Sequence, residues 1–208
     1  MSKALVVDDH PFIRSSVKML LKQEQFEVVA EADNGADALQ LAREHAPDLI
    51  ILDIGMPKLD GLEVINRIVG LGLHSRILVL TSQSAQLYSA RCMRAGAAGY
   101  ISKTNDVEEL VRGIRTVMSG YTFFPNLATS SVRRSDALTT DLELIQALSD
   151  RELTVLQQLS NGLTNNEIAE AMLISNKTVS TYKTRLIEKL QVKSVVYLAD
   201  FAKRNNLI

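Results

Sequence analysis

Five short apolar runs in the first half of the chain limit what it can fold into, because each precedes a segment with apolar residues at helical spacing. The runs lie at residues 3–7, 26–30, 48–53, 76–81 and 99–102. Strands that alternate with helices bury their apolar side chains in a parallel sheet covered by helices on both faces. We therefore predict an α/β domain over residues 1–118.

Acidic residues follow two of these runs. Asp8 and Asp9 come directly after the first run, and Asp53 ends the third. Ligands of open parallel sheets bind beyond the carboxyl ends of the strands, so the three carboxylates should meet there. Carboxylates brought together repel one another, and a divalent cation with oxygen ligands, Mg²⁺, relieves the repulsion. Single Asp residues also cap turns, so the grouping of three carries the prediction.

Two further polar residues follow strands at the same end of the sheet. Thr81 ends the fourth predicted strand and Lys103 follows the fifth. A hydroxyl and an ammonium there could bind the oxygens of a phosphoryl group carried by Asp53, since a carboxylate is able to accept phosphate covalently. The alternatives are that Thr81 merely ends a strand and that Lys103 is a solvated loop residue.

Local signals place the elements that surround this site. The first helix should bury an apolar face that includes Phe12, Val17, Leu20 and Leu21. Asn34-Gly35 should form a turn, and a loop punctuated by Met56-Pro57 and Asp60-Gly61 should follow Asp53. Helices should begin after caps at Ser84 and Asp106.

The second half of the chain changes character. Residues 119–148 are polar and lack helical periodicity, which predicts a linker, although a short helix could form from Leu142 to Leu148. Residues 149–208 predict four helices, and two of them begin with capping boxes, Ser149 with Glu152 and Thr164 with Glu167. The third helix, from Ser175 to Leu190, is basic, with net charge +3 between residues 177 and 189. The second and third helices of this region would form a helix-turn-helix in which the later helix is basic. This arrangement is typical of proteins that bind double-stranded DNA.

These motifs together resemble the NarL/FixJ family of two-component response regulators, and within it the branch of BvgA- and EvgA-like regulators. Residues 1–118 resemble a receiver domain through Val7-Asp8-Asp9-His10, Asp53 to Gly61, Thr81-Ser82 and Lys103. Residues 149–208 resemble the LuxR-type helix-turn-helix domain. The resemblance implies a flavodoxin-like sheet of strand order 2-1-3-4-5 and a small all-α DNA-binding domain. It also implies a sensor histidine kinase as partner and promoter DNA as target.

For the receiver, the resemblance implies a role for each matched position. Asp53 corresponds to the phospho-acceptor. Mg²⁺ would be held by Asp9, Asp53 and the backbone carbonyl of Gly55, with Asp8 acting nearby through water. Thr81 corresponds to the switch hydroxyl, Lys103 to its charge partner and Tyr100 to the aromatic switch, although an aromatic on a strand is often only packed.

For the tail, the resemblance implies which side of the third helix meets DNA. Ser180, Thr181 and Thr184 match base-facing positions, while Val179, Leu186 and Leu190 should face the core. Phosphate contacts should come from Lys177 and Lys183, with help from Thr178 near the start of the helix, and Arg185 is also expected to contact DNA. The family pairs its DNA-binding domains through the last helix, where Val195, Leu198 and Ala199 form an apolar stripe. The alternative is that this stripe closes the core of the tail itself.

Composition adds few constraints. Net charge is −1, so charge alone names no partner, and the single cysteine, Cys92, fits a reducing compartment. No apolar run is long enough to span a membrane, so we expect a cytoplasmic protein without membrane contacts. We expect a regulator that forms a homodimer on DNA, not an enzyme. One alternative, an aspartyl-phosphate phosphotransferase or phosphatase of similar topology, would need a second general acid or base beside Asp53, and the sequence indicates none. Another is a DNA-binding protein whose receiver is only an interaction module, and the intact acids, Thr81 and Lys103 argue against it.

Overall fold

The computed structural model describes residues 1–56, 61–104, 106–125 and 141–208. The chain forms two compact units, Met1–Asn126 and Leu127–Ile208. The predicted loop at residues 57–60 and the centre of the predicted linker, residues 126–140, lie outside the described residues. No helix among the described residues is long and apolar enough to cross a membrane.

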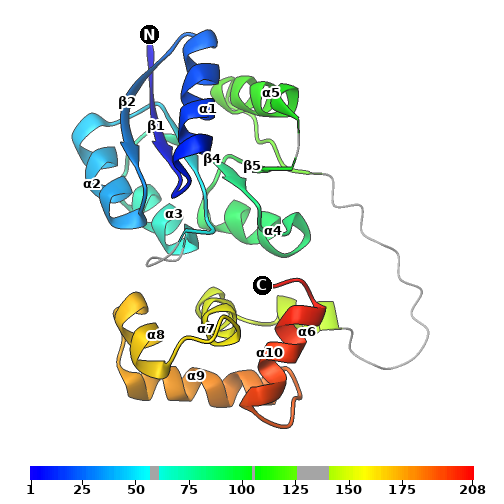
Figure 1. The fold of residues 1–208 in the computed structure, drawn as a ribbon. Helices are drawn as coiled ribbons and strands as arrows, with labels where there is room; N and C mark the ends of the chain where they lie inside the picture. The colour runs from blue at the N-terminus through cyan, green and yellow to red at the C-terminus, as the bar shows by residue number, and fades with distance from the viewer. Residues whose placement is uncertain (57–60, 105, 126–140) are drawn as a thin grey trace. The chain divides into compact units, whose positions relative to one another are not determined.

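The first unit is built on a parallel sheet of five strands (Figure 1). Its strands are β1 (Ser2–Val7), β2 (Phe26–Ala32), β3 (Leu49–Leu52), β4 (Arg76–Thr81) and β5 (Gly99–Ser102). Their order in the sheet is β2-β1-β3-β4-β5, which confirms the predicted topology. The central strand β3 is buried along its whole length, as expected where helices cover both faces.

Helices alternate with the strands along the chain. They are α1 (Pro11–Gln23), α2 (Gly35–His45), α3 (Gly61–Gly70), α4 (Ala85–Ala95) and α5 (Val107–Met118). Helices α1 and α5 cover one face of the sheet, and α2, α3 and α4 cover the other (Figure 1). On the first face, Val17 and Leu21 of α1 and Ile114 and Val117 of α5 join alternate strand residues in one hydrophobic core.

Two local predictions for this unit are wrong. Phe12 does not belong to the apolar face of α1, because its side chain is 80% exposed while Ile13 packs against the core. Asn34-Gly35 does not form a separate turn. The Asn34 side chain accepts a hydrogen bond from the Asp37 N–H and caps α2, whose first residue is Gly35. An Asn serves equally well in a turn or as a helix cap, so its residue type alone did not decide between them.

Two close contacts fix the surroundings of the sheet. A Cβ atom at Gly61 would collide with the backbone of Ile54, so only glycine lets α3 begin this close to the segment after Asp53. Beyond α5, the backbone returns to the sheet, where the Tyr100 N–H donates to the Phe123 carbonyl at 2.8 Å and the Phe123 N–H donates to the Ala98 carbonyl at 3.0 Å. Residues up to Phe123 are therefore part of the first unit.

The second unit, as far as the structure describes it, is built from helices (Figure 1). Its described helices are α6 (Asp141–Gln146), α7 (Asp150–Ser160), α8 (Asn165–Met172), α9 (Asn176–Lys189) and α10 (Val195–Arg204). Both predicted capping boxes are present at the starts of α7 and α8. The core is formed by inward residues of α7 to α10, which include Leu156, Ile168, Val179, Leu186 and Phe201.

Helix α6 is tied to the end of α10 by a polar cluster. Asp141 accepts hydrogen bonds from Arg204 Nε at 2.8 Å and from Asn205 Nδ2 at 2.9 Å. These bonds lower the pKa of Asp141, the amide of Asn205 contributing most, although partial burial works against them. The segment that enters the second unit is thereby fixed to its last helix.

Candidate functional sites

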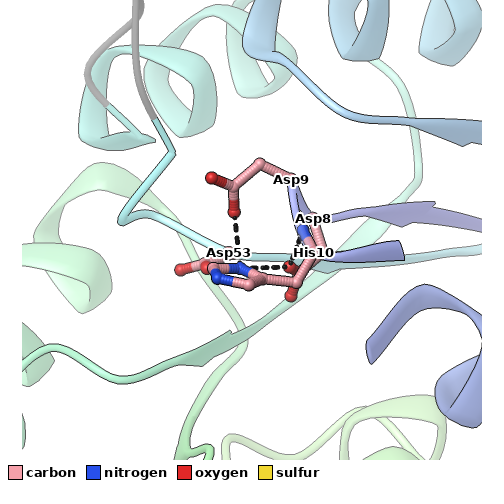
Figure 2. A group of neighbouring side chains, drawn as sticks. All are labelled: Asp8, Asp9, His10 and Asp53. Carbon is pink, nitrogen blue, oxygen red and sulfur yellow. Dashed lines mark hydrogen bonds and ion pairs between the residues drawn. The ribbon is translucent and has the colours of Figure 1, made fainter. Parts of the chain in front are cut away.

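The predicted acidic site is formed where the chain leaves β1 and β3. Asp8 and Asp53 are buried, and Asp9 is half-buried. The Asp53 N–H donates to the Val7 carbonyl at 2.9 Å, which continues the pairing of the two strands by one residue. Figure 2 shows the carboxylates of Asp8, Asp9 and Asp53 gathered with the His10 ring at this edge of the sheet. Ligand atoms from the four residues all lie within 4.8 Å of one another.

Lys103 supplies the positive charge of this pocket. Its Nζ lies 2.5 Å from Asp53 Oδ2 and 2.7 Å from Asp8 Oδ2, and its side chain is 10% exposed. Burial works to lower the pKa of Lys103, but the hydrogen bonds to Asp53 and Asp8 outweigh it and raise the pKa above its usual value. The ammonium is therefore charged and bridges two buried carboxylates, which would otherwise repel each other.

The donor set suits a hard divalent cation. Asp9 Oδ1 is buried and accepts no hydrogen bond of good geometry within the described part of the chain, although His10 Nδ1 lies 2.8 Å away. A buried carboxylate oxygen without a donor costs free energy unless a cation or water satisfies it. Oxygen ligands are those that Mg²⁺ prefers, so Asp9 with Asp8 and Asp53 fits the predicted ion.

Thr81 and Tyr100 are connected through Gln83. The Thr81 hydroxyl is fully buried and accepts a hydrogen bond from the Gln83 N–H at 3.3 Å, which leaves its own hydrogen free to donate. The Tyr100 hydroxyl donates to the Gln83 carbonyl at 2.6 Å. Burial, followed by the proximity of Cys92, Tyr88 and Asp53, raises the pKa of Tyr100, so the hydroxyl stays protonated. Gln83 was not predicted from the sequence, and no local pattern marks a loop residue that acts through its backbone.

Gly55 approaches Asp53 closely. Its N–H donates to Asp53 Oδ1 at 2.8 Å, and an added Cβ would lie 3.3 Å from the same oxygen. Of the predicted site residues of the receiver, these contacts bring together Asp8, Asp9, Asp53, Gly55 and Lys103, whereas Thr81 and Tyr100 are joined to each other through Gln83. His10 is mainly exposed but turns its ring toward Asp8 and Asp9.

In the second unit, α9 carries the predicted nucleic-acid contacts. Val179, Leu186 and Leu190 are buried, as predicted for the core side. Five of the predicted contact residues are exposed: Lys177, Ser180, Thr181, Thr184 and Arg185. Thr178 is half-buried and pairs its hydroxyl with that of Ser175, the cap of α9. Lys183 is half-buried, and its Nζ donates to Asn165 Oδ1 of α8 at 2.9 Å.

One basic residue of α9 is used internally. Lys189 Nζ lies 2.7 Å from Glu152 Oε2, and the Glu152 side chain is 3% exposed. Burial works to raise the pKa of Glu152, but the hydrogen bonds from Lys189 and Ser149 outweigh it and lower the pKa. Part of the positive charge predicted for α9 is therefore paired with Glu152, and this ion pair holds α9 to the start of α7.

The predicted apolar stripe of α10 is divided between the core and the surface. Leu198 is 1% exposed and belongs to the core, and Ala199 is half-buried. Val195 is 37% exposed, and its neighbours Val196 and Tyr197 are also exposed. The large apolar side chains that α10 exposes therefore lie in its first turn.

Comparison with known proteins identifies the class. Residues 4–115 match the family of response regulator receiver domains, and residues 146–202 match the bacterial regulatory proteins of the luxR family. The chain is therefore a two-domain response regulator that acts on DNA. It belongs to the NarL/FixJ-type response regulators, in which a receiver precedes a LuxR-type helix-turn-helix.

Relatives match over the full length. The chain is 52% identical over 206 residues to the transcription regulator BvgA of Bordetella pertussis, covering 99% of both chains. It is 35% identical over 204 residues to the DNA-binding transcriptional activator EvgA of Escherichia coli, covering 98% of both. Among solved structures, the RcsB response regulator of Salmonella typhimurium has the same fold, with a TM-score of 0.76, 24% identity and coverage of 98% of this chain and 97% of the other.

Proposed function

We propose that Asp53 accepts the phosphoryl group from a sensor histidine kinase, with Mg²⁺ held by Asp9, Asp53 and the Gly55 carbonyl and with Asp8 acting nearby through water. The observation that carries the proposal is the position of Asp53. It lies buried at the carboxyl end of β3, with Oδ2 against Lys103 and with the carboxylates of Asp8 and Asp9 grouped beside it. A carboxylate between a fixed cation and a set of metal ligands is suited to in-line phosphoryl transfer.

The transfer step is a substitution at phosphorus. A carboxylate oxygen of Asp53 forms a bond to the phosphorus, the bond from phosphorus to the donor imidazole nitrogen breaks, and the imidazole leaves with the electron pair. Bound Mg²⁺ supplies charge compensation for the phosphoryl oxygens. The Lys103 ammonium is a donor for the same oxygens once Asp53 carries the phosphoryl group.

Thr81 and Tyr100 then transmit the state of Asp53. The hydrogen of the Thr81 hydroxyl is suited to donation to a phosphoryl oxygen. A movement of Thr81 toward that oxygen would disturb the hydrogen bond that its hydroxyl accepts from the Gln83 N–H. Because the Gln83 carbonyl holds the Tyr100 hydroxyl, the same movement would reach the ring of Tyr100. The loop after β4 is in this proposal the connection between phosphorylation and the surface of the receiver.

In the second unit, α9 enters the major groove of promoter DNA. Ser180, Thr181 and Thr184 read base edges, and Lys177, Thr178, Lys183 and Arg185 contact phosphates. The exposure of the hydroxyl residues on one side of α9, opposite the buried Val179 and Leu186, supports placing that side against DNA. Two copies pair on DNA through α10, with Val195 and its exposed neighbours as the contact.

The phosphorylation test uses intact mass. The full chain is incubated with acetyl phosphate and Mg²⁺, and its mass should rise by one phosphoryl group. Asp53→Asn should stay unmodified, as should wild type with a chelator. The matched control, Asp33→Asn, removes an exposed carboxylate outside the pocket and should be modified like wild type. Modification of the Asp53→Asn protein would show that another residue is the acceptor.

The DNA test uses the same samples. Phosphorylated protein is incubated with a pool of random-sequence duplexes, and the bound duplexes are sequenced. Enrichment of a two-half-site sequence by the phosphorylated protein, and weaker enrichment by Asp53→Asn, is the expected result. An absence of any enriched sequence would contradict the proposed role of α9.

A further inference from the structure

A single side-chain amide joins the two helices of the helix-turn-helix. Asn165, the first residue of α8, reaches across to α9. Its Nδ2 lies 3.3 Å from Ser180 Oγ, and its Oδ1 lies 2.9 Å from Lys183 Nζ. Ser180 is exposed and belongs to the proposed base-reading set, so Asn165 touches the reading surface without being part of it.

The chemistry of Lys183 fixes which way this amide points. An ammonium has donors and no acceptor, so the atom of Asn165 that faces Lys183 must be the oxygen. The nitrogen then faces Ser180. An amide nitrogen only donates, so the Ser180 oxygen accepts this bond, and its own hydrogen is not used in it.

The other two hydroxyls of the proposed base-reading set are in the opposite state. Thr181 Oγ1 lies 3.0 Å from the Lys177 carbonyl, and Thr184 Oγ1 lies 3.3 Å from the Ser180 carbonyl. A carbonyl only accepts, so both threonines donate their hydrogens to their own helix. They retain a methyl group and acceptor lone pairs for DNA, whereas Ser180 retains a donor.

We propose that Asn165 is a positioning residue for sequence reading: it holds the Ser180 hydroxyl as a donor toward the major groove. Ser180 should then recognise an acceptor on a base edge, which is purine N7, guanine O6 or thymine O4. The inference rests on the proposed entry of α9 into the major groove, and it assigns Asn165 a role that its position on α8 does not suggest.

Asn165 could instead only hold α8 and α9 together, and a neighbouring residue allows this to be tested. Asn166 Oδ1 accepts a hydrogen bond from Asn176 Nδ2, which is a second link between the same two helices and contacts neither Ser180 nor Lys183. An acidic residue at position 166 therefore tests the effect of added charge beside this helix pairing without changing the hydroxyl.

The decisive variant is Asn165→Asp. A carboxylate keeps the shape of the side chain and still accepts from Lys183, but it has no hydrogen to give to Ser180. The Ser180 hydroxyl then donates its hydrogen to the carboxylate, so this hydrogen is no longer available for a hydrogen bond to the DNA. An acidic residue in the first turn of a helix is favourable, so folding should be retained. Asn166→Asp is the matched control, because it adds the same charge one residue away and keeps the acceptor for Asn176.

The measurement is base preference at each position, using phosphorylated full-length protein and the pool of random-sequence duplexes. Wild type should prefer one base at the position that Ser180 meets. Ser180→Ala and Asn165→Asp should both reduce that preference by about tenfold and leave the other positions unchanged. Asn166→Asp should weaken binding generally and keep the preference. The double variant Asn165→Asp/Ser180→Ala should reduce it no further than Ser180→Ala alone.

Equal profiles for Asn165→Asp and Asn166→Asp would overturn the proposal, and so would loss of preference at different positions in Asn165→Asp and Ser180→Ala. If Asn165→Asp does not fold, Asn165→Ala replaces it and should flatten the same position, because the released hydroxyl turns to its own helix as Thr181 and Thr184 do. A wild-type protein that enriches no sequence would instead refute the proposed role of α9, and the inference would fall with it.

Discussion

The ammonium of Lys103 lies 2.5 Å from the carboxylate of Asp53, so the proposed phospho-acceptor is already paired with a cation of the protein itself. The same ammonium meets Asp8 at 2.7 Å. Removing the charge would leave two buried carboxylates facing each other without compensation. Lys103 should therefore matter for the stability of the pocket before any phosphoryl group arrives.

Lys103→Met should destabilise the receiver by about 3 kcal/mol in the absence of Mg²⁺, as expected when one partner of a buried ion pair is removed. Added Mg²⁺ should recover part of the loss, because a cation again neutralises the carboxylates. Calorimetric unfolding with Mg²⁺ or with a chelator measures both effects, and the exposed Lys22→Met is the control. A loss that Mg²⁺ does not reduce would argue against electrostatic repulsion as its cause.

Thr81→Ala should separate phosphorylation from response. The variant keeps Asp53, Lys103 and the carboxylates, so intact mass should show phosphoryl transfer, but phosphorylation should improve DNA binding less than in wild type. Thr81→Ser keeps the hydroxyl and should restore the response. Both variants are compared at equal extents of phosphorylation, and a full response in Thr81→Ala would exclude the hydroxyl from the switch.

Val196→Glu and Val195→Glu should impair pairing on DNA. Both residues are exposed at the first turn of α10, so a charge there should disturb a partner more than the core. Loss of a contact worth roughly 1–2 kcal/mol should lower affinity for a two-half-site duplex by about tenfold and leave a single half-site almost unchanged. Titration of both duplexes tests this.

Leu198→Ala is the comparison for that experiment. Leu198 is buried, and truncation should cost about 2–5 kcal/mol of folding stability through loss of packing. Binding to both duplexes should then fall together. If Val196→Glu behaves like Leu198→Ala, the surface of α10 has no role in pairing.

Glu152 should make the second unit sensitive to acid. The pKa of Glu152 is lowered in the folded chain, so its contribution to stability is complete above the ordinary value of 4.5 and is lost as pH falls through the folded-state pKa. Glu152→Gln should lower stability at neutral pH by roughly 1–2 kcal/mol and flatten the dependence on pH below 4.5. Calorimetric unfolding across this pH range measures the effect. The transition to follow is the one that Mg²⁺ does not shift, because it belongs to the second unit, and Glu188→Gln, at an exposed position, is the control. Parallel pH curves for wild type and Glu152→Gln would contradict this role.

The sequence predicted the parts of the molecule that depend on local pattern. Asp53 and Thr81 could be placed because each ends an apolar run, and the ends of parallel strands meet at one edge of a sheet. Ser149 and Thr164 could be placed because capping boxes have a fixed spacing. Phe12 was misplaced because a single apolar residue near the start of a helix fits more than one face.

Contacts between distant residues could not be predicted in this way. The pairs Glu152–Lys189 and Asn165–Lys183 join residues 37 and 18 positions apart, and nothing in the local sequence of either member indicates the other. The sequence also predicted Val195, Leu198 and Ala199 as one stripe, but only Val195 is exposed. Residue spacing indicates which side of a helix is apolar, but it does not indicate which part of that side another helix covers.

The return of the chain to β5 after α5 has a consequence for aggregation. Strand β5 is the outermost strand of the sheet on that side, and Phe123 covers the Tyr100 N–H and the Ala98 carbonyl. Unpaired groups along such a strand are a template on which another chain adds its own strand. A receiver cut at residue 118 would expose that template and should self-associate, whereas a fragment that extends to residue 125 carries its own protection.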